Sequence, residues 1–95
     1  MIRFNPEFLA ELKASLLREP RPDLADQVEA LSVIEFYEAQ RPLYQFIHVV
    51  PKHWLPQGEL DRLILGGVPG LFCLLLHEGR IAIIEVMSRD VVLRD

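Results

Sequence analysis

Two apolar runs joined by a Glu-Gly pair, at residues 71–87, constrain the fold of this chain more than any other stretch. The first run is Leu-Phe-Cys-Leu-Leu-Leu, and the second is Ile-Ala-Ile-Ile-Glu-Val-Met. Glu78-Gly79 predicts a tight hairpin turn between them, because glycine accepts the positive φ that such a turn requires. Both faces of the predicted hairpin are apolar, so each of them needs a covering layer.

A two-residue turn fixes the register of this hairpin, because residues at equal distances from the turn then face each other. The expected facing pairs are Leu76 with Ile81, Leu74 with Ile83, and Phe72 with Glu85. The opposite face then carries Leu71, Cys73, Leu75, Ala82, Ile84 and Val86. We interpret Glu85 as structural, either near solvent at a sheet edge or paired with an arginine. A buried carboxylate also marks some functional sites, so a role in a site stays open.

The first third of the chain predicts two helices. Asn5 is a good N-cap, and Pro6 stands at the first helical position, where its missing N–H costs nothing. The apolar stripe of this helix is formed by Phe8, Leu9, Leu12, Leu16 and Leu17. Pro20 and Pro22 end it, because a residue before proline avoids the α region. Residues 22–31 carry apolar side chains at helical spacing and predict a second, shorter helix.

A pair of strands is expected next. Residues 32–37 and 43–50 are rich in β-branched and aromatic residues, which favour strands. Arg41-Pro42 predicts the turn between them. A single helix over residues 23–40 is the alternative.

His48 lies in the second of these strands, opposite Val33 in the favoured register and diagonal to Glu35. A pH-sensitive pair of His48 with Glu35 is one hypothesis. An ordinary, partly exposed strand histidine is the other.

The remaining segments predict one more helix and one more strand. Residues 59–65 predict a short helix that ends at Gly66-Gly67, with its apolar side chains facing inward. Residues 91–93 predict a short last strand. The order is then α-α-β-β-α-β-β-β in a single domain over residues 1–95. It indicates a two-layer α+β fold, with a mainly antiparallel sheet of about five strands and two to three helices on one side.

Composition narrows the possible function. The net charge of −4 argues against a general affinity for nucleic acid or anionic lipid. The single cysteine excludes an internal disulfide and fits a reducing compartment. The chain begins without the pattern of a signal peptide, and its apolar runs are far shorter than the ~20 residues of a membrane helix. We therefore expect a soluble cytoplasmic protein.

No catalytic residue, metal site or cofactor is predicted. Cys73 lies in a predicted strand centre, and no serine stands in a Gly-x-Ser-x-Gly setting. His48, His53 and His77 lack the spacing of metal ligands, and no second cysteine supports them. The glycine-rich residues 66–70 lead from a predicted helix into a strand, whereas a phosphate-binding loop opens a helix.

The loop around Trp54 is an interaction candidate. His53, Trp54 and Leu55 lie between Pro51 and Pro56, so a large aromatic side chain stands on a stiffened segment. That arrangement is typical of an interface anchor. The alternative is that Trp54 folds back and caps the core.

The apolar surplus supplies the leading functional hypothesis. The predicted helices cover one face of the sheet, and the second face, centred on Cys73, Ala82 and Ile84, has no evident cover. An uncovered apolar face of this kind marks an association surface. We therefore expect a non-enzymatic, homodimeric interaction module that binds another protein as adaptor, chaperone or inhibitor. Because the chain is acidic, a basic protein would suit it as a partner. The alternative is a small-molecule sensor or binding domain with an apolar pocket between sheet and helices.

Overall fold

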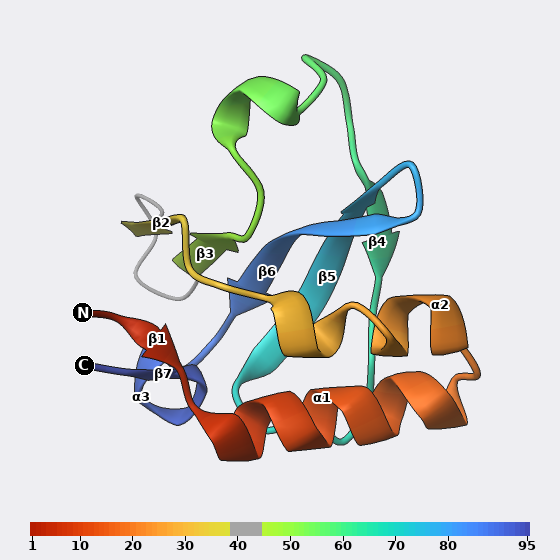
Figure 1. Cartoon of the computed structure of the whole chain (residues 1–95), viewed down its shortest axis with the longest axis vertical. Helices are drawn as coiled ribbons and strands as arrows, with labels where there is room; N and C mark the ends of the chain where they lie inside the picture. The colour runs from red at the N-terminus through yellow and green to blue at the C-terminus, as the bar shows by residue number, and fades with distance from the viewer. Residues whose placement is uncertain (39–44) are drawn as a thin grey trace.

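The computed structural model describes residues 1–38 and 45–95, and it confirms the α+β fold (Figure 1). A five-stranded antiparallel sheet and a small two-stranded sheet are accompanied by three α-helices in this part of the chain. The helices are α1 (Pro6–Arg18), α2 (Pro22–Ala25) and α3 (Arg89–Val92), with 3₁₀ turns η1 (Val28–Ala30) and η2 (Lys52–Trp54). The strands are β1 (Arg3–Phe4), β2 (Glu35–Glu38), β3 (Gln45–His48), β4 (Asp61–Leu63), β5 (Leu71–His77), β6 (Arg80–Val86) and β7 (Leu93–Arg94).

Helix α1 begins where the sequence predicts it. Oδ1 of Asn5 accepts a hydrogen bond of 3.1 Å from the backbone N–H of Glu7, and Pro6 opens the first turn. Phe8, Leu12 and Leu16 are buried, so the predicted apolar stripe faces the core. Leu17, which was expected in the stripe, lies on the exposed side.

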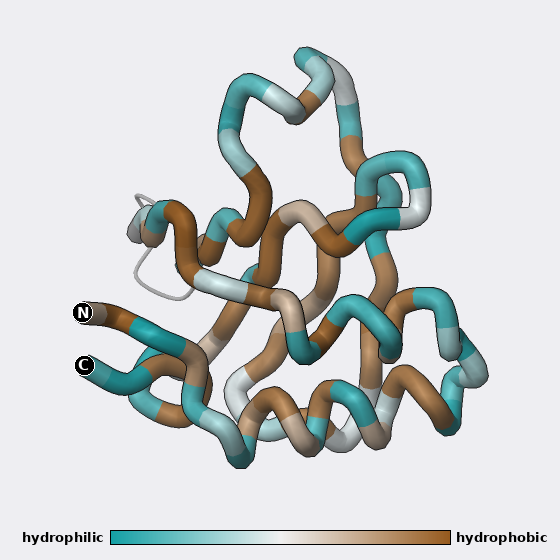
Figure 2. The backbone as a smooth tube through the Cα atoms, viewed as in Figure 1, coloured by the Kyte–Doolittle hydropathy of each residue, from teal (hydrophilic) through white to brown (hydrophobic). Residues whose placement is uncertain are grey.

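The main sheet has the strand order β2-β3-β6-β5-β4, with every neighbouring pair antiparallel. One of its faces packs against all three α-helices in a single core. Its buried members include Leu12, Leu24, Ile47, Leu74, Ile84 and Val92. Figure 2 shows this arrangement as hydrophobic stretches along β5 and β6, with hydrophilic residues at the hairpin turn.

The central hairpin turns at Glu78-Gly79 as predicted, but its register is different. Leu76 pairs with Ile81, whereas the next pair is Leu75 with Ile83, so Ala82 is an extra residue in β6. A second irregularity leaves Phe72 as the extra residue in β5.

The facing pairs beyond the bulge therefore differ from the prediction. They are Leu74 with Ile84, Cys73 with Glu85, and Leu71 with Val86. The predicted pairs Leu74–Ile83 and Phe72–Glu85 are wrong. A β-bulge adds one residue to one strand and so exchanges the faces of the residues that follow it.

Two predicted elements near the end of the chain are also wrong. Residues 59–65 do not form a helix, because residues 61–63 are strand β4, which pairs with the outer edge of β5. Residues 91–93 do not form one strand, since α3 ends at Val92 and β7 begins at Leu93. Strand β7 pairs with β1 outside the main sheet.

The strand interpretation of residues 32–37 is confirmed over the helical alternative, although β2 begins later, at Glu35. His48 lies directly opposite Glu35, not opposite Val33. The predicted turn at Arg41-Pro42 falls outside the described residues.

Candidate functional site

The second face of the sheet is the first candidate site, and we call it the open face. Strand alternation from the core residues assigns it the side chains Glu35 and Tyr37, Phe46 and His48, Ile83 and Glu85, Cys73 and Leu75, and Arg62. The three α-helices of the described chain all contribute to the core on the other face.

Part of the open face is covered by the segment that follows β3. Leu55 and Leu60 pack against a small cluster formed by Val50, Ala82 and Ile83. The expectation of a wholly uncovered face is thus wrong at this end, because the loop that precedes β4 supplies apolar side chains. At the other end, neither Cys73 nor Glu85 belongs to an apolar cluster of the described residues.

Cys73 and Glu85 form the centre of the open face. Sγ of Cys73 donates a hydrogen bond of 3.0 Å to Oε2 of Glu85, and the two residues are only 0% and 7% exposed. Burial raises the pKa of the Cys73 thiol to about 12, and its hydrogen bond to Glu85 adds to this shift. The thiol therefore stays protonated as a donor, which makes it a poor nucleophile.

Glu85 does not lie near solvent at a sheet edge, which is one of the two structural roles expected for it. It lies on β6, which is flanked by β3 and β5, so it is not at a sheet edge. Within the described residues no lysine or arginine forms an ion pair with it. A carboxylate buried without a cation is costly, and among the described residues this one accepts a hydrogen bond from a weakly donating thiol.

His48 is the second buried polar group of the open face. It is 8% exposed, and its Nδ1 atom is buried without a hydrogen-bond partner in the described chain. The ring contacts Tyr37 edge-on, with 4.9 Å between ring centroids, and Lys52 Nζ lies 5.4 Å from the centroid of Tyr37. Burial lowers the pKa of His48, with a smaller contribution from Lys52, while Glu35 opposes the shift.

Trp54 does not lie within the core. Its indole is 52% exposed at the end of η2, and the guanidinium of Arg80 lies 5.6 Å from the ring centroid. His53 beside it is exposed as well, and Leu55 makes the contact with the apolar cluster.

The structure separates the other predicted interaction residues. Cys73 and Ala82 lie on the side of the open face, whereas Ile84 is fully buried among the helices, because of the bulge at Ala82. Ile64 and Met87, which the sequence did not single out, follow β4 and β6 directly and are 66% and 61% exposed. They stand just beyond the ends of the two strands, next to core-facing Leu63 and Val86.

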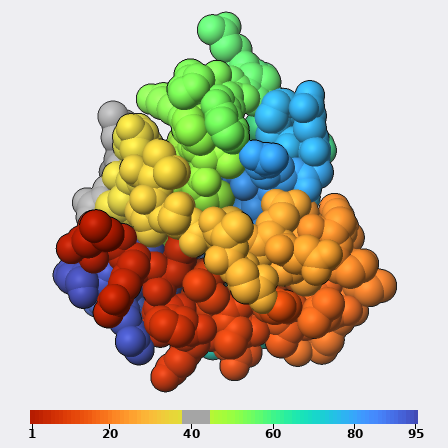
Figure 3. Space-filling view, viewed as in Figure 1, coloured from red at the N-terminus to blue at the C-terminus, as the bar shows by residue number. Residues whose placement is uncertain are grey.

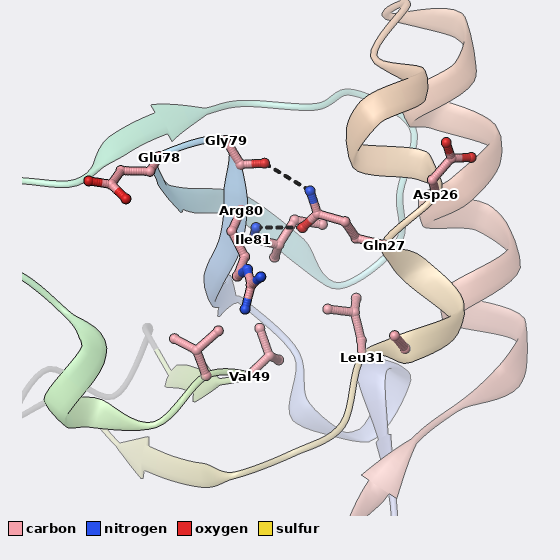
Figure 4. A pocket seen from close by; sticks show the side chains of 10 residues that line it. Asp26, Gln27, Leu31, Val49, Glu78, Gly79, Arg80 and Ile81 are labelled. Carbon is pink, nitrogen blue, oxygen red and sulfur yellow. Dashed lines mark hydrogen bonds between the residues drawn. The ribbon is translucent and has the colours of Figure 1, made fainter.

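A pocket of about 540 Å³ opens elsewhere, between the helical segment and the sheet (Figure 4). It is lined by Asp26, Gln27, Ala30, Leu31, Val49, Val50, Glu78, Gly79, Arg80 and Ile81. Three segments far apart in sequence build it, and Figure 3 shows them meeting on one face of the molecule, in orange to yellow, green and blue. No local sequence pattern could have predicted it.

Comparison with known proteins gives no relative: no family model, no curated protein and no solved structure matches the chain. Among the described residues no group of three or more His, Cys, Asp or Glu side chains is placed to hold a metal ion. None of the helices in the described ranges is long and apolar enough to cross a membrane.

Proposed function

We propose that this protein is a non-enzymatic interaction module that works as a homodimer and binds another protein as adaptor, chaperone or inhibitor. The observation that carries the proposal is the buried carboxylate of Glu85, which has no cationic partner among the described residues. Two exposed apolar side chains, Ile64 and Met87, stand directly after the strands that carry Arg62 and Glu85. The net charge of −4 would suit a basic partner for the assembled dimer.

The open face is self-complementary in a simple geometry. Arg62 lies on β4 and Glu85 on β6, and these strands are the two neighbours of β5. Adjacent strands are about 4.8 Å apart, so the two residues stand at similar distances on either side of β5. A two-fold axis along β5, in the plane between two open faces, places β4 of each copy over β6 of the other.

In such a dimer each Arg62 can reach the partner's Glu85. Arg62 is level with Leu75, which is two positions along β5 from Cys73 and its pair Glu85. Two positions correspond to about 7 Å along a strand, within the span of an arginine side chain across two packed sheets. The pairing would supply a cation to the buried carboxylate, which has none among the described residues, twice per dimer.

Apolar burial would add to the same interface. Full burial of an isoleucine or methionine side chain contributes about 1.5–3 kcal/mol, and two-fold symmetry buries Ile64 and Met87 twice each. The summed contribution of these side chains is comparable to the free-energy cost of association, which is about 4–15 kcal/mol.

The test is the mass in solution, by light scattering coupled to gel filtration at micromolar concentration. Wild type is expected at twice the monomer mass, and Met87→Glu and Ile64→Glu are expected as folded monomers, since both sites are exposed in one copy. Leu17→Glu is the matched control, because Leu17 is an exposed apolar residue on α1, far from the open face. A wild-type monomer at this concentration would rule the proposal out.

A further inference from the structure

The pocket between the helical segment and the hairpin turn is open to solvent and has a lining that is about equally polar and apolar. Leu31, Val49, Val50 and Ile81 supply its hydrophobic side chains, and Ala30 lies at its exposed rim. Its volume of about 540 Å³ is within the range of about 300–1,000 Å³ found for small-molecule sites. The space is therefore suited to a small ligand that carries both an apolar body and a polar group.

Gln27 holds two sides of the pocket together. Its Nε2 donates to the carbonyl oxygens of Gly79, at 2.8 Å, and Asp23, at 3.3 Å, while its Oε1 accepts from the backbone N–H of Ile81 at 2.9 Å. The amide thus bonds β6 in the manner of a neighbouring strand (Figure 4). Both of its polar atoms are used, so Gln27 fixes the shape of the pocket and leaves recognition of a polar ligand group to other side chains.

Arg80 is the cation of the pocket, and its charge is not paired with a carboxylate within the described chain. No described carboxylate forms an ion pair with it. Its guanidinium lies against the face of Trp54, with 5.6 Å to the ring centroid, which restrains the side chain without using its N–H groups. In Figure 4 Arg80 extends among the lining residues, whereas Glu78 and Asp26 point away from it.

We propose that this pocket binds a small organic monocarboxylate with an aliphatic or aromatic body. The guanidinium fork of Arg80 matches a carboxylate in a bidentate pair, and the partly exposed side chains of Leu31 and Val49 offer an apolar wall to the body of the ligand. Asp26 and Glu78 at the rim repel a second negative charge, so the site discriminates against dicarboxylates and phosphate esters. Binding at this pocket is independent of the dimer through the open face.

The fluorescence of Trp54 tests the proposal directly, because this is the one tryptophan of the chain and its ring contacts Arg80. Wild type is titrated with hexanoate, octanoate, hexylamine and succinate at pH 7. Hexanoate is expected to change the emission with saturation at millimolar concentration or below, and each added methylene that is buried tightens binding by up to about fourfold. No saturable change with any carboxylate, or tighter binding of hexylamine, would overturn the proposal.

Three variants locate the site. Arg80→Gln should weaken octanoate binding at least tenfold, and Ala30→Phe should block the pocket from its exposed rim. Arg94→Gln on β7 removes the same charge from an exposed position outside the pocket and should bind as wild type does. Circular dichroism confirms that each variant is folded. Wild-type affinity in Arg80→Gln would contradict the proposal, and so would an equal loss in Arg94→Gln, because the effect would then be one of net charge.

Discussion

Cys73 and Glu85 face each other across β5 and β6, and the thiol donates a hydrogen bond of 3.0 Å to the carboxylate. The contact exists because the bulge at Ala82 shifts the hairpin by one residue. It places an ionisable pair at the centre of a face that carries both apolar and polar side chains. The thiol satisfies one lone pair of the carboxylate, and no lysine or arginine of the described residues forms an ion pair with it, which is the physical reason to expect a cation from a second copy.

The raised pKa of Cys73 predicts a loss of stability in alkali. The folded-state pKa is about 12 against 9.0 for a free thiol, so the unfolded chain releases its proton first as pH rises. The contribution of Cys73 is therefore complete below pH 9 and declines between pH 9 and 12, by up to about 1.4 kcal/mol per pH unit. Urea unfolding at pH 8 and pH 10 measures it. The decline should be smaller in Cys73→Ala, and an unchanged decline would assign it to other groups.

The dimer geometry predicts energetic coupling between Arg62 and Glu85 of opposite copies. Arg62→Gln and Glu85→Gln should each weaken dimerisation, and the double variant should be little weaker than either single one. A coupling free energy above about 1 kcal/mol in the dimer dissociation constants is expected for a close charge pair. If the effects of the two substitutions on the dissociation constant were additive, this pairing would be contradicted. Dimerisation itself is tested separately, by the mass of the wild-type protein in solution.

Burial of His48 predicts a loss of stability in mild acid. Its folded-state pKa lies below the ordinary 6.5, so the unfolded chain takes up the proton first as pH falls. The contribution is complete above pH 6.5 and is lost as the pH falls toward the folded-state value, with a slope of at most about 1.4 kcal/mol per pH unit. Glu35 and Lys52 act on the ring in opposite directions, and Tyr37 contacts it edge-on. Unfolding curves from pH 7 to pH 5 should show a smaller slope in His48→Gln than in wild type.

The exposure of Trp54 predicts that its side chain contributes little to folding. Trp54→Ala should lower the free energy of unfolding by at most about 1 kcal/mol, since the indole is half in water and contacts Arg80. Leu55→Ala should cost more, because Leu55 packs on the cluster around Ala82 and Ile83. Denaturant unfolding followed by circular dichroism gives both values. A larger loss for Trp54→Ala than for Leu55→Ala would restore the core-capping role.

Local chemistry explains which elements could be predicted from the sequence. The Asn5-Pro6 helix start and the Glu78-Gly79 turn depend on residues within a few positions of one another, and both are confirmed. Strand β4 depends on pairing with β5, which overrides the helical spacing of Leu60, Leu63 and Ile64. The bulge at Ala82 likewise depends on the neighbouring strands. No pattern in the local sequence therefore indicates that Glu85 lies on the open face.

The pocket illustrates the same limit for the candidate site. Arg80 and Trp54 were visible as single residues, and Trp54 was predicted to lie on an interaction loop. Their contact, and the amide bridge of Gln27, join segments about 25 to 55 positions apart. Long-range contacts of this kind follow from the packing of η1 and η2 around the hairpin. A sequence pattern within one segment does not predict that packing.

The bridge of Gln27 predicts a local loss of order in β6. Gln27→Ala removes the partners of the Gly79 carbonyl and the partly buried Ile81 N–H, which should cost about 1–3 kcal/mol. The amide hydrogen of Ile81 should exchange faster than in wild type, by a larger factor than those of residues paired between β3 and β6. Gln57→Ala is the matched control, since Gln57 is an exposed glutamine in the loop before β4, and its change should stay within about 0.5 kcal/mol. Hydrogen exchange by NMR resolves both effects. If the exchange rate at Ile81 were unchanged in Gln27→Ala, water would replace the Gln27 amide without loss of stability. The bridge would then not fix the shape of the pocket.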